Sequence, residues 1–400
     1  MMALLAVEAA LAQLLNGVTA LPAEPVAIDR VRGRVLAEPV RATLTQPPFD
    51  ASAMDGYAIR WADLPGPWRV AGDSAAGHGW AGTLQPGEAA RIFTGAPLPA
   101  GADTVVVQEE IRRDGDIATL SGDGPPRLGA HIRRAGQDFA AGDVLADAGD
   151  PLTPARIGLL AAAGHGVLPV VRRPRVTLIA TGDELVPPGV APGPDQIVST
   201  NGVMLRALFE NAGAVVADPG IIPDRREALA AAITAASGDI IVTIGGASVG
   251  DHDLVVPVLR DLGADIDFWK IAMRPGKPML AGRFAGARVI GLPGNPVSAH
   301  VCALLFVLPL LARLGGRAEA LPMRLLPLAA PLAANGARRD HLRARLTPAG
   351  TAEIFQSQDS ALLGRLAAAQ LLIVRPPGAA AASAGDMVDC ITLDSIGNVS

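Results

Sequence analysis

Hydrophobic and polar positions change their pattern along this chain, and each change predicts a different kind of structure. Residues 3–15 carry apolar side chains at helical spacing, and Ala27–Arg41 mixes Val, Ile and Leu with charged residues, as a half-exposed sheet edge does. Between residues 46 and 137, short apolar runs separated by Gly, Pro and Asp turns predict β structure. The strands predicted there are Trp68–Ala71, Ala89–Phe93, Thr104–Ile111 and Ile117–Leu120. His131–Leu145 is extended again, and a helix is predicted over Thr153–Ala163.

From Arg172 to Gly316 strand-like and helical segments alternate. The predicted strands are Val176–Ala180, Ala214–Ala217, Asp239–Ile244, Asp267–Ile271 and Val289–Leu292. The predicted helices are Asn201–Ala212, Arg225–Ala236, Leu254–Leu262 and Val297–Leu314, with Thr200 or Asn201 capping the first and Asp224 capping the second. This alternation predicts a doubly wound α/β domain, whose ligands bind at the carboxyl ends of the strands.

These patterns predict an α/β multidomain protein. An extended N-terminal α+β domain (1–45 and 138–171) is interrupted by a small inserted β domain (46–137). The doubly wound domain (172–316) follows, and a β domain (317–400) ends the chain. Its predicted strands are Met323–Leu326, His341–Leu346, Leu371–Val374 and Met387–Ile391.

Composition excludes several classes of function. The net charge of −5 provides no broad basic field, so we expect no nucleic-acid partner. Two cysteines in 400 residues suit a reducing compartment. The longest apolar run, Val301–Ala312, contains Pro309 and is shorter than the roughly 20 residues that span a membrane. The opening segment carries Glu8 and no early basic residue, unlike a signal peptide. We therefore expect a soluble, cytoplasmic protein without a membrane partner.

Lysine usage is more specific. Lys270 and Lys277 are the only lysines among 34 basic Lys and Arg residues, and they lie seven positions apart. One explanation is a GC-rich coding bias that favours arginine codons and leaves two lysines at random positions. Alternatively, both positions require a compact ammonium group, as at a phosphate or oxyanion site.

Polar residues cluster in several turns. The segment Pro48–Ala58 holds Asp50, Ser52 and Asp55, which could bind a metal, orient an oxyanion or simply cap a turn. Thr94 lies where a strand ends at a Thr-Gly step, which could equally be a structural turn. In Gly245–Asp253 the glycines allow close approach of a ligand, and the following helix start attracts an anion. Asp253 could instead be the cap of that helix, and His252 either an acid–base group or an exposed turn residue.

Four turns should converge on one edge of the predicted sheet. They are Thr181–Glu184, Thr243–Asp253, Lys270–Pro278 and Gly291–Ser298. Their pocket would combine the carboxylates of Glu184, Asp224 and Asp253 with the cations Lys270, Arg274 and Lys277. Such a mixture suits a phosphate-bearing ligand with Mg²⁺, because the metal neutralises the acidic side and the cations hold the anion.

The same segments resemble a known family. Phe49–Ala58, Thr94–Pro97, Thr181–Leu185, Gly245–Gly250, Pro275–Pro278 and Gly291–Ser298 are similar, in order, to motifs of the molybdopterin molybdenumtransferase family, the MoeA and gephyrin type. The resemblance covers nearly the whole chain and is loosest over the last 80 or so residues.

The resemblance implies an elongated four-domain homodimer with its active site between the α/β domain and the partner's inserted β domain. The implied reaction converts adenylylated molybdopterin and molybdate, with Mg²⁺ or a similar cation, into molybdenum cofactor, AMP and water. The implied catalytic residues are Asp55, Thr94, Asp138, Glu184, Asp224, Asp253, Lys270 and Lys277, with Asp55, Glu184 and Asp253 as metal ligands. The implied ligand-binding residues are Thr181, Gly182, Gly245, Gly246, Ser248, Arg274, Pro293, Pro296, Ser298, Arg338 and Ser360.

Some family members carry lysine where this chain has Arg274, which keeps the charge and changes the donor geometry. Arg338 and Ser360 align with pocket residues of the family. Protein partners would be a molybdopterin adenylyltransferase and molybdoenzymes. The alternatives are nucleotidyl transfer, as in the adenylyltransferase relatives of the α/β domain, and a non-catalytic scaffold or silent paralogue. The segments around Asp55 and Thr94 argue against the first, and the retained charged residues against the second.

Overall fold

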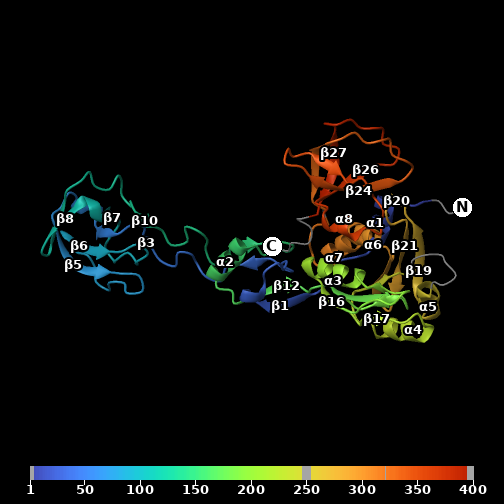
Figure 1. Ribbon diagram of the computed structural model, residues 1–400. Helices are drawn as coiled ribbons and strands as arrows, with labels where there is room; N and C mark the ends of the chain where they lie inside the picture. Colours follow the sequence, from blue (N-terminus) through green and yellow to red (C-terminus); the bar gives the residue numbers. More distant parts are fainter. Residues whose placement is uncertain (1–3, 246–253, 320, 394–400) are drawn as a thin grey trace.

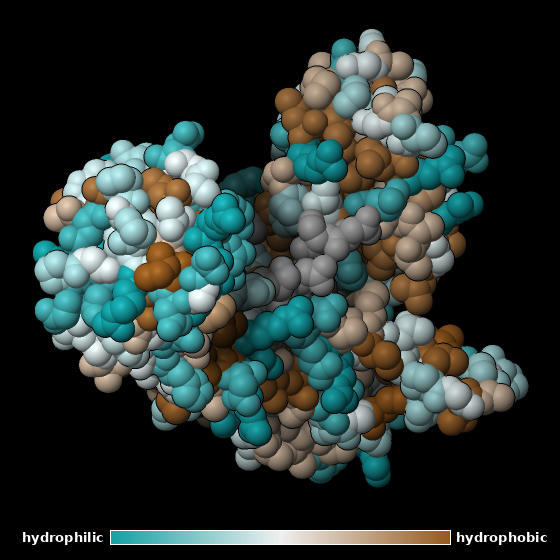
Figure 2. Space-filling view, turned by 90° about the vertical axis from the view of Figure 1, so that its left-hand side faces the viewer, coloured by the Kyte–Doolittle hydropathy of each residue, from teal (hydrophilic) through white to brown (hydrophobic). Residues whose placement is uncertain are grey.

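The computed structural model describes residues 4–245, 254–319 and 321–393. In Figure 1 the inserted β sheet forms one end of an elongated molecule, and the N-terminal unit with β1, β12 and α2 lies in the middle. The α/β sheet and the C-terminal β sheet form the other end. Hydrophilic and hydrophobic residues are intermixed over the face shown in Figure 2.

The α/β sheet confirms the doubly wound prediction. Its strand order is β16-β13-β18-β22-β21-β19, and β17 also pairs with β13. The strands are β13 (Arg175–Thr181), β16 (Val215–Ala217), β17 (Ile221–Ile222), β18 (Ile240–Ile244), β19 (Asp265–Lys270), β21 (Pro278–Phe284) and β22 (Ala287–Leu292). β21 was not predicted, and it pairs antiparallel with both β19 and β22. After β13 the chain forms a separate two-stranded parallel ladder of β14 (Leu185–Val186) and β15 (Ile197–Val198) before α3 begins.

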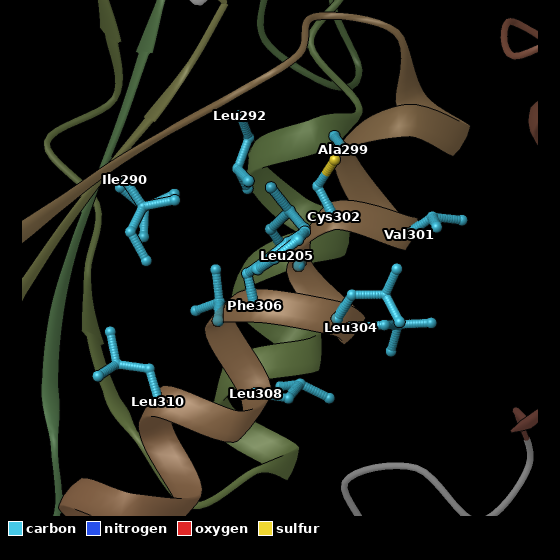
Figure 3. Packing of buried hydrophobic residues seen from close by; sticks show 14 of the residues in the cluster. Leu205, Ile290, Leu292, Ala299, Val301, Cys302, Leu304, Phe306, Leu308 and Leu310 are labelled. Carbon is cyan, nitrogen blue, oxygen red and sulfur yellow. The ribbon is translucent and has the colours of Figure 1, made fainter. Parts of the chain in front are cut away.

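Helices cover both faces of the α/β sheet. One face is buried by α1 (Val7–Leu15), α3 (Asn201–Asn211), α6 (Pro296–Cys302), the π-helical η4 (Ala303–Val307) and α7 (Leu308–Leu314). The other face is buried by α4 (Arg226–Ala235) and α5 (Val255–Asp261). Figure 3 shows the first core, where Leu205 of α3 lies among side chains of η4 and its neighbours. Residues 1–45 were predicted to belong to the N-terminal domain, but α1 packs in this core.

The segment Pro296–Leu314 is helical throughout and lies inside the molecule. Its 19 residues have a mean hydropathy of 2.0, enough by length and composition to cross a membrane, yet 83% of the tested window is buried. Its apolar character is therefore explained by core packing. Pro309 has no N–H for the preceding turn, and the π-helical turn directly before it is one way a helix adjusts to such a residue.

The inserted domain is a six-stranded sheet of order β7-β4-β6-β5-β9-β8. Its elements are β4 (Gly56–Ile59), η2 (Trp61–Asp63), β5 (Trp68–Ser74), β6 (Glu88–Ile92), β7 (Thr104–Val107), η3 (Gln108–Glu110), β8 (Ile111–Asp114) and β9 (Ile117–Leu120). The 3₁₀ turn η3 divides the single strand predicted over Thr104–Ile111. The small ladder of β3 (Ala51–Ser52) with β10 (Ile132–Arg133) pairs the two chain segments that enter and leave this sheet.

The N-terminal unit is built from two short antiparallel ladders and one helix. Its elements are β1 (Ala23–Ala27), η1 (Ile28–Arg30), β2 (Val40–Arg41), β11 (Val144–Ala146), α2 (Pro154–Ala162) and β12 (Val167–Val171). The helix predicted over Thr153–Ala163 is confirmed by α2. Thr153 caps it, because its side chain accepts a hydrogen bond from Arg156 N at the helix start.

The C-terminal sheet has the order β20-β24-β26-β27-β23. Its elements are β20 (Met273–Arg274), β23 (Met323–Pro327), β24 (Arg339–Leu346), β25 (Ala352–Ile354), α8 (Leu363–Ala367), β26 (Leu371–Arg375) and β27 (Met387–Thr392). β25 and α8 were not predicted. β20 comes from the Lys270–Pro278 segment, so this predicted site segment also ties the two sheets together.

We expect the stability of the fold to decrease as the pH falls from about 6.5 toward 3. His341 on β24 is 2% exposed, and burial lowers its pKa to about 3. The unfolded chain, with an ordinary histidine pKa of about 6.5, then binds a proton that the folded chain does not. At pH 5 this difference amounts to about 2 kcal/mol. Urea unfolding at pH 7.5 and pH 5 measures it. His341→Gln should reduce the dependence, with the part due to the partly buried His300, whose pKa is lowered to about 4, remaining, while His78→Gln, at an exposed position, should leave it unchanged. Equal pH dependence in all three proteins would contradict this assignment.

Candidate functional site

The carboxyl ends of the central parallel strands meet at one edge of the α/β sheet. The register pairs Ala180 of β13 with Ile244 of β18, and Ile244 with Leu292 of β22. A cavity of about 310 Å³ opens there. It is lined by Ala180, Thr181, Glu184, Leu185, Ile197, Val198, Ser199, Thr200, Asn201, Ile244, Gly245, Gly294, Asn295, Pro296 and Ala361. The cavity therefore lies at the carboxyl ends of the strands, where a doubly wound sheet binds its ligands.

The turn after β13 carries an acidic cluster. Thr181 Oγ1 donates a hydrogen bond to Asp224 Oδ1 at 2.5 Å, and the Asp224 backbone N–H donates to Asp183 Oδ1 at 3.1 Å. Asp224 was predicted to cap α4, but that helix has Arg225 at its N-cap position and no side-chain cap bond. The Asp224 carboxylate instead holds the Thr181 turn in place. Glu184 is exposed and borders the cavity.

Asn201 forms part of the cavity wall from the first turn of α3. Its Nδ2 donates to Gly294 O at 2.6 Å, which joins the start of α3 to the turn after β22. Thr200 occupies the N-cap position without a side-chain cap bond, so neither predicted cap residue acts as one. In the part of the chain that the structure describes, Asn201 Oδ1 is buried and accepts no hydrogen bond.

The C-terminal domain closes one side of the cavity. Asn295 Nδ2 donates to Ser360 Oγ at 3.1 Å, and Val297 N donates to Ser360 O at 3.1 Å. Ala361, the next residue, lines the cavity. Ser360, in the loop between β25 and α8, thus contacts the start of α6 from the C-terminal domain.

This loop is held by a buried arginine. Arg343 is 1% exposed, and its guanidinium donates to the carbonyl oxygens of Leu362 at 3.1 Å and Asp359 at 2.8 Å, with a longer contact of 3.5 Å to Ser357. The planar guanidinium carries five donors, so one side chain can satisfy several carbonyls at once. Arg343 therefore fixes the segment that carries Ser360.

The predicted cations lie at the same sheet edge, outside the cavity lining. β19 points in the same direction as β22 because β21 is antiparallel to both, so its carboxyl-terminal residue Lys270 lies at the edge where β22 ends. Lys277 directly precedes Pro278, which pairs with Lys270, and it is exposed. The Arg274 guanidinium contacts the buried carboxylate of Asp340 in the C-terminal sheet. Arg274 therefore has a structural partner in addition to any ligand.

Asp55 and Thr94 form a second polar site in the inserted domain. Thr94 donates to Asp55 Oδ1 from its backbone N–H at 2.7 Å and from its hydroxyl at 2.9 Å. These two hydrogen bonds lower the pKa of Asp55. The carboxylate is therefore held ionised and oriented. In Figure 1 this domain is remote from the α/β sheet of the same chain, so one chain does not bring Asp55 to the cavity.

The remaining predicted residues are distributed as follows. Asp138 is exposed, and Arg338 is half-buried with its carbonyl accepting from Asn335. Gly182 is buried beside Glu184, and Pro293 precedes the cavity residue Gly294. Ser298 was expected at an open helix start but is only 5% exposed and does not line the cavity. Gly246, Ser248 and Asp253 lie outside the described residues.

No single chain assembles the predicted metal site within the described residues. They contain no group of three His, Cys, Asp or Glu side chains placed to hold a metal ion. Asp55 and Glu184 lie in separate domains (Figure 1). Mg²⁺ is commonly held by one or two carboxylates together with substrate phosphates. The exposed Glu184 carboxylate at the cavity is suited to this mode of binding. The described residues do not form a cage made of protein ligands alone.

Sequence reasoning missed Asn295, Ala361 and Arg343, and it took Asn201 for a helix cap. Asn295 stands in a recognised motif between glycine and proline, and its polar side chain was the available signal. Ala361 and Arg343 belong to the C-terminal domain, and local sequence does not reveal that a loop of this domain, held by Arg343, borders the cavity.

Three family models match the chain. The MoeA N-terminal region (domain I and II) matches residues 5–164, a probable molybdopterin binding domain matches residues 177–313, and the MoeA C-terminal region (domain IV) matches residues 326–393.

Named relatives match over most of their length. A molybdopterin molybdenumtransferase of Nostoc is 41% identical over 74% of this chain and 70% of the relative. Molybdopterin molybdenumtransferase 2 of Mycobacterium tuberculosis is 38% identical over 90% of this chain and 92% of the relative. The crystal structure of a molybdopterin biosynthesis MoeA protein from Pyrococcus horikosii is similar with a TM-score of 0.85 and 31% identity, covering 98% of this chain and 99% of that one.

Proposed function

The chain belongs to the molybdopterin molybdenumtransferase family, and we propose that it inserts molybdate into adenylylated molybdopterin and releases AMP. As a member of that family it is an enzyme, a transferase of molybdenum cofactor biosynthesis. The specific substrate, the metal and the assembly described below are parts of the proposal.

The observation that carries the proposal is the cavity at the carboxyl ends of β13, β18 and β22. Its wall combines backbone turns, hydroxyl and amide side chains and the Glu184 carboxylate, and both lysines lie along the same sheet edge. A heterocyclic ligand suits the cavity, and its phosphates suit the ammonium groups. Lys270, Arg274 and Lys277 compensate the charge of phosphate and molybdate in this proposal, while Thr181 and Asp224 keep the turn around the ligand in shape.

The active site is completed by a second copy of the chain in this proposal. Asp55 and Thr94 are oriented as a pair, yet they lie at the far end of the same chain (Figure 1). An elongated homodimer would bring this pair of one subunit to the cavity of the other. Phe49, Met54 and Phe93, near the pair in sequence, are exposed apolar residues that such contact would cover.

The chemistry is cleavage of the adenylate anhydride coupled to metal insertion. Mg²⁺, when bound, supplies neutralisation of phosphate charge, with Glu184, Asp253 and the partner's Asp55 as its proposed ligands. The ionised Asp55 orients water or substrate through its second oxygen, because Thr94 occupies Oδ1. Asp138 is a further acidic residue of the proposed site. The dithiolene of the substrate receives the molybdenum. We also propose a cytoplasmic location, delivery of substrate by an adenylyltransferase and transfer of product to molybdoenzymes.

The test is insertion from purified components. We expect AMP release from adenylylated molybdopterin that requires molybdate, Mg²⁺ and this protein, together with reconstitution of a cofactor-free molybdoenzyme. Omission of molybdate is the matched control and should abolish reconstitution. Adenylylation of free molybdopterin by ATP, or binding without turnover, would contradict the proposed reaction.

A further inference from the structure

The turn that carries Lys277 is in contact with α6. Gly276, the residue before it, is buried, whereas Lys277 itself is exposed. Cys302, the last residue of α6, is 0% exposed and belongs to the buried cluster shown in Figure 3. Its thiol donates a hydrogen bond to Gly276 O, with 3.6 Å between sulfur and oxygen. Burial raises the pKa of this thiol to about 12, so the sulfur keeps its proton and remains a donor.

Gly276 has no free space on the side that faces α6. Its φ of +99° lies in the region that favours glycine. A Cβ atom added there would lie 2.4 Å from Cys302 Sγ, 3.3 Å from Met273 Cε and 3.7 Å from Ser298 O. Ser298 and Cys302 are four residues apart on α6 and therefore lie on one face of the helix. Gly276 packs directly on this face.

The two ends of the turn are fixed by other contacts. Ile271 N donates to Lys277 O at 2.8 Å, and Pro278 pairs with Lys270 where β21 begins. Among the described residues Lys277 forms no ion pair, so the direction of its side chain depends on the backbone beside it. That backbone is Gly276, and Cys302 is the side chain that contacts it from α6.

We propose that Cys302 is a positioning residue, which holds Gly276 on α6 and thereby sets the place of the Lys277 ammonium group at the ligand-binding edge. The inference rests on the proposed function, in which Lys277 compensates the charge of phosphate and molybdate. In Cys302→Ala we expect the KM for molybdate to rise about tenfold, less than the hundredfold that a misplacement of about 1 Å can cost. The kcat at saturating molybdate should change less than KM, because the change weakens binding of the oxyanion.

The first measurement observes Lys277 without turnover. Reductive methylation with ¹³C-formaldehyde converts each lysine to a dimethylamine that keeps its charge, and Lys270 and Lys277 are the only lysines. The NMR spectrum of the methylated protein therefore contains two lysine signals, and Lys277→Arg assigns them by removing one. In Cys302→Ala the Lys277 signal should shift or broaden, and it should do so more than the Lys270 signal.

The matched control is Cys390→Ala. Cys390 is also a free cysteine that is 0% exposed, but it lies in the core of the C-terminal sheet. Both alanine variants remove a buried sulfur and should unfold at a lower urea concentration than the wild type. Only Cys302→Ala should also change the Lys277 signal and the KM for molybdate. A purely structural role would give the two variants the same kinetics.

A second variant approaches the contact from the other side. Gly276→Ala places a Cβ atom against Cys302 Sγ and should raise the KM for molybdate. Adding Cys302→Ala removes the sulfur, so the double variant should recover part of that increase, because the two effects are coupled through one contact. This comparison also tests the inference if Cys302→Ala alone does not fold.

An unchanged Lys277 signal together with an unchanged KM in Cys302→Ala would overturn the inference. The same holds if Gly276→Ala has an equal KM with and without Cys302→Ala. A wild type that shows no molybdate-dependent AMP release, while Cys302→Ala still moves the Lys277 signal, would instead refute the proposed reaction and leave the positioning of Lys277 by Cys302 standing.

Discussion

Asp55→Asn is expected to lower the rate of molybdate-dependent AMP release by at least about a hundredfold, the usual effect of removing one preorganised electrostatic group. Asparagine retains an oxygen that can accept from Thr94 N–H and Oγ1, so the local turn should survive. What is lost is the negative charge, which those two hydrogen bonds stabilise by lowering the pKa of Asp55. Single-turnover AMP release measures the effect.

The control is Asp116→Asn in the same domain, whose carboxylate is 86% exposed and which should release AMP at the wild-type rate. Mixing Asp55→Asn with Lys270→Ala then tests the second copy. If one site uses Asp55 of one subunit and Lys270 of the other, mixed dimers contain one intact site of two. Random pairing should restore about a quarter of the activity. Mixtures that stay as inactive as the single variants would contradict a site shared between subunits.

Arg343→Met is expected to lower the free energy of unfolding by about 3 kcal/mol or more. The substitution leaves the carbonyls of Leu362 and Asp359 without their donors in a buried place, at about 1–3 kcal/mol each. Because the same loop carries Ser360 against Asn295, the KM for adenylylated substrate should rise more than kcat falls. Urea unfolding and steady-state kinetics measure the two effects.

Arg345→Met provides the comparison, since Arg345 lies two residues further along β24. Its side chain is 58% exposed and pairs with Glu353, an arrangement that contributes less than about 1 kcal/mol. A similar loss of stability in both variants would show that position on the strand, and not the carbonyl contacts, is responsible. A fall in kcat alone would contradict a role in shaping the pocket.

Local pattern was sufficient for the parallel core of the sheet and for the edge that carries the cavity. Strand–helix alternation predicted β13, β18 and β22, and the glycine-rich turns after them predicted where a ligand could approach. The antiparallel β21 (Pro278–Phe284) was not predicted because it begins with a proline, contains a glycine and follows a segment that was interpreted only as a binding turn.

Contacts between distant segments could not be predicted. Nothing near Arg274 indicates that its guanidinium meets Asp340, 66 positions away, and nothing near Arg343 indicates that it supports a wall of the cavity. Asparagine at a helix start is typical of a cap, so Asn201 was predicted as one. Its side-chain amide instead donates a hydrogen bond to Gly294 O in the turn after β22, a contact between distant segments. Ser298 shows the reverse, because its helix start is covered by packing that the sequence around it does not display.

The position of the two lysines has a consequence for covalent chemistry. Because Lys270 and Lys277 are the only side-chain amines in the sequence, acylation, glycation or carbamylation of lysine can strike this chain only at the edge of the sheet where β19 and β22 end. The other basic side chains counted with lysine are arginines, which acylating and carbamylating reagents leave unmodified. Acetylating or carbamylating conditions would therefore modify lysine side chains of this chain only at that edge of the sheet.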